Sequence, residues 1–165
     1  MVGLTVVKGD LLSVTEGVIA HGVNCRGAFG SGVAGAIARK FPWVRDSYLH
    51  KHNTEGWVLG DVQLVKQDGT NQPKKSSMQG ILSLPGVVFA NCATQDDFGT
   101  DKVNLDYPAL ERCLDKVLHF CEKAKLPLSI PRIGCGLAGG DWDRVRAIIE
   151  KVNEKRNVQI TVYEL

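Results

Sequence analysis

The 165-residue sequence lacks a C-x-x-C pair, a long apolar run and a large excess of charge of one sign. Its five cysteines are an odd number without zinc-like spacing, so we expect reduced intracellular thiols and no metal site. No apolar stretch approaches the roughly 18 residues of a membrane span, and no basic segment followed by an apolar run begins the chain. We therefore expect a cytoplasmic protein with no membrane partner.

The charges nearly balance, with 20 Lys and Arg against 18 Asp and Glu and a net charge of +2. A protein that binds nucleic acid through its charge usually has a larger excess of basic residues, so we expect no nucleic-acid partner. Hydrophobic residues make up 44% of the chain, an ordinary share for a globular protein. The length predicts one domain over residues 1–165, and we expect a monomer.

Strand-like and helix-like segments alternate along the chain. The patterns predict strands at residues 4–7, 18–23, 62–65, 81–84, 87–92, 128–133 and 158–163. They predict helices at residues 32–41, 43–52 and 107–124, and another from about Trp142. Polar loops are expected at residues 67–79, which include Lys74 and Lys75, and at residues 95–104. This order predicts a three-layer α/β fold, with helices on both faces of a mixed, mostly parallel sheet.

Two segments share the order of buried strand, glycine-rich loop and helix. In the first, NCRGAFGSG follows the strand at residues 18–23, and in the second GCGLAGG follows the strand at residues 128–133. Glycine lets the backbone approach a ligand closely, and the helix that follows presents unpaired N–H groups at its positive end. Two such loops at one sheet edge predict a cleft for a diphosphate. Neither loop matches the P-loop or a clean G-x-G-x-x-G fingerprint.

The residues that carry these loops resemble the macro domain. The resemblance rests on VVKGDLL at residues 6–12, IAHGVNCRGAFGSGVAGAIARKFP at residues 19–42 and IPRIGCGLAGGDW at residues 130–142, with ITVYEL at residues 160–165. It covers nearly the whole chain. The branch it is most similar to holds the yeast-type ADP-ribose-1″-phosphate phosphatases and the terminal ADP-ribose protein glycohydrolases.

The resemblance implies a role for each matching position. Asp10 would accept a hydrogen bond from the adenine amino group, Leu11 would offer a backbone N–H, and Asn24 would lie near the distal ribose. The implied substrate-binding residues are Gly9, Asp10, Leu11, Asn24, Ser31, Gly32, Val33, Ala34, Gly35, Ala36, Arg132, Ile133, Gly134, Cys135, Gly136, Leu137, Ala138 and Leu165. No cofactor is implied.

One departure from the family pattern concerns catalysis. The glycohydrolase relatives use a lysine at the end of the strand that matches residues 88–92, and an aspartate directly after the Gly-Cys-Gly-Leu loop. Here the first region reads Asn-Cys-Ala-Thr at residues 91–94, and the second position is Ala138. We therefore do not expect the lysine-dependent removal of ADP-ribose from proteins.

Three polar residues are the catalytic candidates, Asn24, His21 and Asp141. His21 in the second strand can act as an acid or base, or be a satisfied half-buried histidine. Asp141 can orient a water against a terminal phosphate, or cap the helix from Trp142. Asp96 and Asp97 on the other loop are rivals for the same role.

The remaining candidates each have an ordinary structural interpretation. Asp10 can be a turn or capping residue, and Asn24 can hydrogen-bond its own loop. Cys135 at a helix N-terminus can be a small loop residue rather than a nucleophile. His50 and His52 point to different faces of a helix, so they predict no metal site. The aromatic candidates for stacking on adenine or closing the cleft are Phe29, Phe98, Trp142 and Tyr163.

From these residues we predict a protein that binds ADP-ribose derivatives and hydrolyses ADP-ribose-1″-phosphate to ADP-ribose and phosphate. Loop amides would hold the phosphates, while a carboxylate or histidine orients the attacking water. The alternatives are a reader module that binds ADP-ribose without turnover, and a hydrolase that removes ADP-ribose from modified protein or nucleic acid. A dinucleotide dehydrogenase fits least, because the fingerprint and the acidic residue that follows it are missing.

Overall fold

The computed structural model describes residues 3–66, 86–99 and 101–164, and in it six strands form one sheet. The order across the sheet is β1-β6-β5-β2-β4-β3, and every pair is parallel except β3 with β4. The strands are β1 (Leu4–Lys8), β2 (Val18–Asn24), β3 (Val62–Lys66), β4 (Val88–Gln95), β5 (Leu128–Ile130) and β6 (Ile160–Glu164). The predicted mixed, mostly parallel sheet is confirmed.

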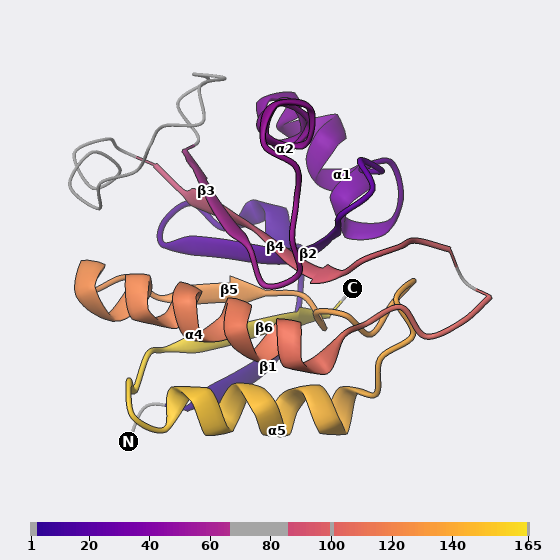
Figure 1. Ribbon diagram of the computed structural model, residues 1–165. Helices are drawn as coiled ribbons and strands as arrows, with labels where there is room; N and C mark the ends of the chain where they lie inside the picture. Colours follow the sequence, from indigo (N-terminus) through magenta and orange to yellow (C-terminus); the bar gives the residue numbers. More distant parts are fainter. Residues whose placement is uncertain (1–2, 67–85, 100, 165) are drawn as a thin grey trace.

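Helices cover both faces of this sheet and complete three layers (Figure 1). Two helices, α1 (Gly32–Lys40) and α2 (Pro42–Thr54), lie on one face, and α4 (Tyr107–Ala124) and α5 (Trp142–Asn153) lie on the other. A short 3₁₀ helix, η1 (Leu11–Ser13), follows β1. The predicted three-layer arrangement is therefore what the chain adopts.

Each face of the sheet has its own apolar core. Strand β2 supplies both, because Val18 and Ala20 face α4 and α5 whereas Ile19 and Val23 face α1 and α2. A strand buried on both faces reads as a nearly continuous apolar run, which is the pattern of residues 18–23. Helix α4 contributes a buried stripe to the first core, whose members are Ala109, Leu110, Cys113, Leu114, Val117, Leu118, Phe120 and Cys121.

Local chemistry fixes where the long helices begin and end. The Asp106 carboxylate caps α4 by accepting a hydrogen bond from the Ala109 N–H at 2.8 Å, and the Asp141 carboxylate caps α5 by accepting from the Asp143 N–H at 3.1 Å. Helix α4 ends at Ala124, and Lys125, which follows it as the C-cap, has a left-handed backbone with φ 58°. Pro42 occupies the first turn of α2, where its missing N–H costs nothing.

Two strands are cut short at one end by two or more residues relative to the prediction. Strand β5 stops at Ile130 rather than residue 133, because Pro131 has no N–H and its carbonyl turns back to accept from the Ile133 N–H at 2.7 Å. Strand β6 begins at Ile160 rather than residue 158. Val158 lies in the connection between α5 and β6, where both its N–H and its carbonyl bond to the Asn153 side chain at 2.8 Å.

Strand β4 is longer than predicted and reaches Gln95, three residues beyond the expected end at residue 92. Of the three additional residues, Ala93 and Gln95 pair with Val23 and Asn24 at the end of β2, and Thr94 lies at the register shift between these two pairs. The predicted loop at residues 67–79, with Lys74 and Lys75, and the predicted strand at residues 81–84 lie outside the described residues.

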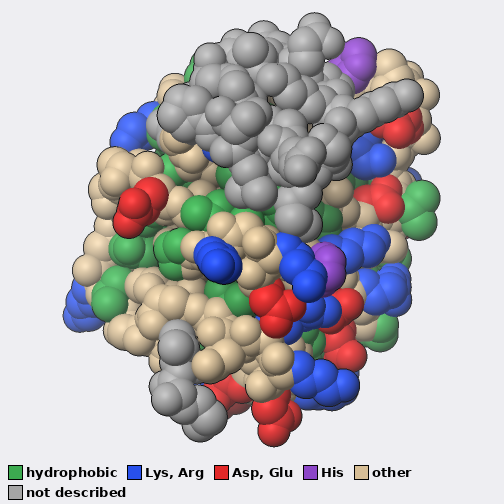
Figure 2. Space-filling view, turned by 90° about the vertical axis from the view of Figure 1, so that its left-hand side faces the viewer, with side chains coloured by type: hydrophobic (Ala, Val, Ile, Leu, Met, Phe, Trp, Pro, Cys, Tyr) green, Lys and Arg blue, Asp and Glu red, His purple; other side chains and the backbone are tan. Residues whose placement is uncertain are grey.

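Charges of both signs are interspersed on the surface. On the face shown in Figure 2, Lys and Arg side chains lie beside Asp and Glu side chains over the described part of the chain. One mixed group joins α4 to the end of α5, where the Arg156 guanidinium contacts the carboxylates of Asp115 at 2.9 Å and Glu122 at 3.1 Å. None of the described helices is both long and apolar enough to cross a membrane.

The parallel strands bring three loops to the same edge of the sheet. Because β5 and β4 flank β2, the loops that follow β5, β2 and β4 lie next to one another, at the right of Figure 1. Ligands of open α/β sheets bind outside the carboxyl ends of the strands, at such an edge.

Candidate functional site

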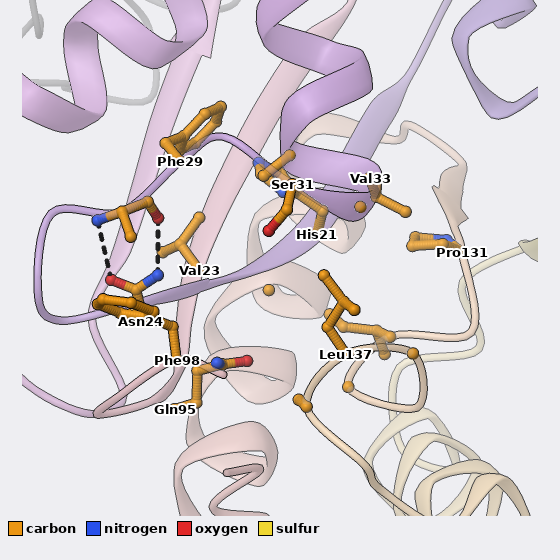
Figure 3. Close-up of a pocket in the computed structure, with 18 of the residues that line it drawn as sticks. His21, Val23, Asn24, Phe29, Ser31, Val33, Gln95, Phe98, Pro131 and Leu137 are labelled. Atoms are coloured by element: carbon orange, nitrogen blue, oxygen red, sulfur yellow. Dashed lines mark hydrogen bonds between the residues drawn. The ribbon is translucent and has the colours of Figure 1, made fainter. Parts of the chain in front are cut away.

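A cavity of about 570 Å³ opens between the three loops at the carboxyl edge. This volume suits a ligand of nucleotide size. The first loop follows β2 and leads into α1, the second follows β5 and leads into α5, and the third follows β4 (Figure 3). The lining residues are His21, Gly22, Val23, Asn24, Ala28, Phe29, Gly30, Ser31, Gly32, Val33, Ala34, Gln95, Phe98, Gly99, Pro131, Arg132, Ile133, Gly134, Gly136, Leu137 and Ala138.

Asn24 organises the first loop from inside. Its side-chain oxygen accepts from the Arg26 N–H at 2.9 Å and the Ala28 N–H at 3.2 Å, and its amide nitrogen donates to the Ala28 carbonyl at 2.6 Å. The last two bonds are the dashed lines of Figure 3. The Tyr48 hydroxyl lies 2.7 Å from the Asn24 carbonyl and also accepts from the Gly27 N–H at 3.0 Å. Asn24 lines the cavity, but the hydrogen bonds of its side chain hold the first loop in its conformation.

The first loop ends in an unblocked helix N-terminus. Ser31 is the N-cap of α1, and its hydroxyl makes no capping hydrogen bond. The first turn of a helix has no carbonyls of its own to accept its N–H groups, so the amides of Gly32, Val33 and Ala34 are available. Together with the helix dipole, they form a site for an anion at one wall of the cavity.

The second loop is a compact pair of turns that also presents amides. The Cys135 N–H donates to the Arg132 carbonyl at 3.0 Å, and the Gly140 N–H donates to the Gly134 carbonyl at 2.8 Å. Gly134 has φ 77°, which is the left-handed conformation that favours glycine. Within the described residues, the N–H groups of Gly136, Leu137 and Ala138 donate to no acceptor. They provide a second set of donors for anionic oxygens.

The two glycine loops touch across the cavity. A Cβ on Gly32 would lie 3.2 Å from Cδ1 of Leu137, so the Leu137 side chain rests against the start of α1 (Figure 3). Leu137 is 49% exposed, and the other exposed apolar side chains at this mouth are Val33 and Phe98. This apolar rim can cover a ligand held by amides beneath it.

His21 is the ionisable side chain at the inner wall. It is 1% exposed, its Nε2 lies 2.6 Å from Oδ1 of Asn91, and its ring meets the edge of Phe29 at a centroid distance of 5.4 Å. Burial lowers the pKa of His21 to about 4, and the hydrogen bond to Asn91 opposes only part of that shift. The imidazole is therefore neutral at physiological pH.

The cavity wall carries few charges. Among the lining residues the ionisable side chains are His21 and Arg132, and none is a carboxylate. Arg132 forms an ion pair with Glu164, and its guanidinium lies 5.4 Å from the centre of the Trp142 ring. An anionic ligand would thus be held mainly by backbone dipoles and one paired cation.

Several residues expected at the site are not among those that line the cavity. Among the described residues, the expected positions that do not line the cavity are Gly9, Asp10, Leu11, Gly35, Ala36, Cys135 and Asp141. Asp10 caps η1, where its carboxylate accepts from the Leu12 N–H at 2.9 Å, and Asp141 is the cap of α5. The structure therefore does not bring Asp141 to the cavity as a water-orienting carboxylate. Leu165 lies outside the described residues.

The other candidates are also placed. Burial raises the pKa of the Cys135 thiol to about 11, so this cysteine is not an activated nucleophile. Asp96 on the third loop forms an exposed ion pair with Arg26 of the first loop, and Asp97 pairs with Lys102. The described residues hold no cluster of His, Cys, Asp and Glu that could bind a metal ion.

The aromatic candidates separate into buried and exposed ones. Phe29 is buried against His21, whereas Phe98 is 54% exposed at the mouth of the cavity. Trp142 packs beneath Arg132, and Tyr163 lies against Gly9. Phe98 is therefore the aromatic side chain best placed to close over a ligand.

Two residues of the third loop were missed in the sequence. Gln95 and Gly99 line the cavity, whereas the expectations for this loop were Phe98 as an aromatic of the cleft and Asp96 and Asp97 as rivals to Asp141. Ala28, Gly30 and Pro131 could have been found, because they lie within the two glycine segments. The pairing of β4 with β2, which brings Gln95 to the cavity, has no local signal.

A model of the macro domain family matches residues 20–149, which hold both glycine loops. The chain belongs to the macro domain family. A similar relative of this macro domain is an ADP-ribose 1″-phosphate phosphatase of Meyerozyma guilliermondii, 30% identical with 97% of each chain covered. The human ADP-ribose glycohydrolase OARD1 is also 30% identical, with 98% of this chain and 91% of the relative covered. A Bacteroides thetaiotaomicron protein of unknown function superposes with a TM-score of 0.81 at 28% identity and covers 99% of each chain.

Proposed function

We propose that this macro domain binds ADP-ribose derivatives in its cavity and hydrolyses ADP-ribose-1″-phosphate to ADP-ribose and phosphate. The observation that carries the proposal is the arrangement of two sets of unpaired amides, from the start of α1 and from residues 136–138, around one cavity of about 570 Å³. Backbone N–H groups held on rigid loops bind phosphate oxygens without fixed cations. This agrees with the chain's near-neutral net charge of +2.

Hydrolysis would rest on position and electrostatics. The oxygen of a water molecule would attack the terminal phosphorus, and the bond from phosphorus to the 1″ oxygen would break. Phosphoryl transfer passes through a loose transition state whose charge lies on the phosphoryl oxygens, so amides that hold those oxygens are the main source of catalysis. The lining residues lack a carboxylate, which leaves neutral His21 as the group that orients the water.

Two positions separate the phosphatase from the lysine-dependent glycohydrolase reaction. Residues 91–94 lie towards the end of β4, where the resemblance places the lysine; they read Asn-Cys-Ala-Thr, and all four side chains are buried and uncharged. Ala138 is 5% exposed where the resemblance places the aspartate. The relatives named as phosphatases therefore support the proposed reaction better than the relatives named as glycohydrolases do.

A module that binds ADP-ribose without turnover is the second candidate. It is favoured by the lining of the cavity, where none of the described residues is a carboxylate that could act as a general base. We further propose that residues 1–165 form one macro domain, monomeric and cytoplasmic.

The deciding experiment measures phosphate release from ADP-ribose-1″-phosphate by the purified protein, with binding of ADP-ribose followed by calorimetry. A His21→Gln variant removes the imidazole from the cavity. An Arg146→Gln variant serves as the control, since Arg146 forms an exposed ion pair with Glu150 on α5, away from the cavity.

Release by the wild type and the control, with loss in His21→Gln and retained ADP-ribose binding, is the expected result. Binding of ADP-ribose without phosphate release from folded protein would contradict the phosphatase and leave the binding module. Release of ADP-ribose from a modified protein or nucleic acid instead would indicate the third activity.

A further inference from the structure

A chain of buried side-chain amides connects His21 on β2 to a backbone carbonyl of helix α2. Nε2 of His21 lies 2.6 Å from Oδ1 of Asn91 on β4, and Nδ2 of Asn91 donates to Oε1 of Gln63 on β3 at 3.0 Å. Nε2 of Gln63 then donates to the carbonyl of Ser47 on α2 at 2.9 Å. His21, Asn91 and Gln63 are 1%, 0% and 8% exposed. Four elements that are distant in sequence thus meet in one polar line.

The chemistry of the last acceptor sets the direction of every bond in this line. The Ser47 carbonyl can only accept, so Gln63 must present its NH₂ group to it and its oxygen to Asn91. Asn91 then presents its NH₂ group to Gln63 and its oxygen to His21. An amide oxygen can only accept, so the proton of the His21 ring must be on Nε2.

We propose that Asn91 and Gln63 are positioning residues, which hold His21 as the tautomer protonated on Nε2 and so reserve Nδ1 as an acceptor for an O–H group of the ligand or the attacking water. As a statement about hydrolysis, the inference rests on the proposed phosphatase. As a statement about the tautomer, it stands on the hydrogen bonds alone. The role is indirect, because neither amide lines the cavity.

The unused nitrogen of His21 supports this assignment. Its Nδ1 is buried and has no hydrogen-bond partner within the described residues, although the residue itself lines the cavity. Buried polar groups are nearly always paired in native proteins, so an orphan acceptor beside a cavity calls for a partner that binds there. The polar line occupies Nε2 and leaves Nδ1 as the bare acceptor nitrogen of the ring.

The surroundings of the ring keep it neutral. His21 contacts Asn91 from β4 and Phe29 from the first loop, and Tyr48 of α2 lies behind Phe29 at a centroid distance of 5.0 Å. Burial raises the pKa of Tyr48 to about 12, so it carries no charge at neutral pH. Burial lowers the pKa of His21, the bond to Asn91 opposes only part of that shift, and no neighbouring charge among the described groups contributes to it.

The test reads the tautomer of His21 directly, from its two ¹⁵N resonances in the folded protein at neutral pH. We expect Nε2 to be protonated and Nδ1 to be the bare nitrogen, and we expect ADP-ribose to shift the Nδ1 resonance. In Asn91→Leu the acceptor is gone, so the Nδ1-protonated tautomer should become populated. In Asn91→Asp an oxygen still accepts from Nε2, so the tautomer should persist.

Activity and its pH dependence give the second arm. Asn91→Leu should lower kcat for phosphate release by at least about tenfold, within the range of positioned acid–base groups, with KM little changed. Asn91→Asp should retain more of kcat and move the acid limb of the pH profile upward, because a carboxylate beside His21 raises its pKa. Gln63→Leu should also lower kcat, but by less than Asn91→Leu does, because Gln63 acts on His21 only through Asn91.

A matched control is Asn153→Leu. It removes a buried side-chain amide that hydrogen-bonds to the N–H and the carbonyl of Val158, away from the cavity. It should lower stability and leave the His21 resonances unchanged. A proton on Nδ1 in the wild type, an Asn91→Leu tautomer identical to wild type, or an Nδ1 resonance unmoved by ADP-ribose would each overturn the inference. Absence of phosphate release with the expected tautomer and ligand shift would contradict the phosphatase alone.

Discussion

The hydroxyl of Thr94 occupies the space in which a side chain at residue 22 would lie. A Cβ on Gly22 would be 2.5 Å from Oγ1 of Thr94, and the next nearest atoms would be ordinary contacts at 3.7 Å and 3.8 Å. Gly22 lines the cavity, while Thr94 is fully buried and its hydroxyl has no hydrogen-bond partner in the described structure. The two residues therefore share one volume at the floor of the site.

This shared volume predicts strong coupling between two substitutions. Gly22→Ala should lower the free energy of unfolding by about 1–3 kcal/mol, because the new methyl group forces Thr94 aside. Thr94→Ala removes the obstructing oxygen without breaking a hydrogen bond, so the double variant should be more stable than the sum of the single effects implies, by about 0.5–3 kcal/mol. Urea denaturation of the four proteins measures this difference.

The control for this cycle is Gly136→Ala. Gly136 lines the same cavity, but an added Cβ would meet nothing within 4 Å, so its stability should hardly change. Additive effects of Gly22→Ala and Thr94→Ala would show that the backbone, rather than the Thr94 hydroxyl, limits residue 22.

Asn24 should prove to be a loop organiser as well as a cavity residue. Asn24→Ala would leave the N–H groups of Arg26 and Ala28 and the carbonyl of Ala28 without their partner. We expect the free energy of unfolding to fall by about 1–3 kcal/mol, and ADP-ribose to bind about tenfold or more weakly because the loop must be ordered on binding. Asn24→Asp keeps the accepting oxygen and should lose less of both.

Calorimetry and denaturation on the same samples test this dual role. Weakened binding in Asn24→Ala with wild-type stability would contradict the organising role and make Asn24 a direct ligand contact. Tyr48→Phe, which removes the hydroxyl that bridges Asn24 and Gly27, should reproduce part of the loss.

Burial of neutral His21 predicts that stability depends on pH in the acid range. The pKa of His21 is about 4 in the folded protein and 6.5 in an unperturbed histidine, so between these values the unfolded chain binds more protons. The His21 contribution to the free energy of unfolding should therefore be highest above pH 6.5, fall as the pH drops from 6.5 to about 4, and level off below that. The shift corresponds to roughly 3 kcal/mol in total.

The His21→Gln variant isolates this contribution from that of the other titrating groups. Glutamine can still donate to Asn91 but cannot gain a proton, so the variant should lose less stability than the wild type between pH 7 and pH 4. Denaturant midpoints at several pH values give the comparison. Parallel curves for the two proteins would mean that His21 has a nearly normal pKa in the fold.

The main architecture could be predicted from the sequence because its signals are local. The apolar run at residues 18–23 and the glycines after it indicate a buried strand and a close backbone approach, and the structure has both. The errors also have local causes. Pro131 ended β5 early, and the Asn153 side chain took both backbone groups of Val158 away from β6.

What the sequence could not predict depends on contacts between distant segments. The line from His21 through Asn91 and Gln63 to Ser47 joins four elements, and only His21 stands out in its own segment. The choice between cap and catalyst at Asp141 likewise required the position of α5 relative to the cavity.

Asp10 offers a sharp separation of structural and ligand-binding roles. Its carboxylate caps η1 by accepting from the Leu12 N–H. The N–H of the neighbouring Gly9 donates to the Glu164 carbonyl, and the Glu164 carboxylate pairs with Arg132 of the second loop. Asparagine caps as well as aspartate, so Asp10→Asn should keep the free energy of unfolding within about 0.5 kcal/mol, whereas Asp10→Ala should lose about 0.5–2 kcal/mol.

Asp10→Asn should change ligand binding even though it leaves the free energy of unfolding almost unchanged. A carboxylate accepts from the exocyclic amine of adenine, whereas an asparagine can also donate to the oxygen that replaces that amine in hypoxanthine. We expect Asp10→Asn to weaken ADP-ribose by about tenfold and to bind its hypoxanthine analogue at least as well as the wild type does. Calorimetric titration of both ligands into both proteins measures this change in preference. Equal affinities of wild type and Asp10→Asn for ADP-ribose would restrict Asp10 to its capping role, and the adenine would then have to be recognised by another part of the carboxyl edge.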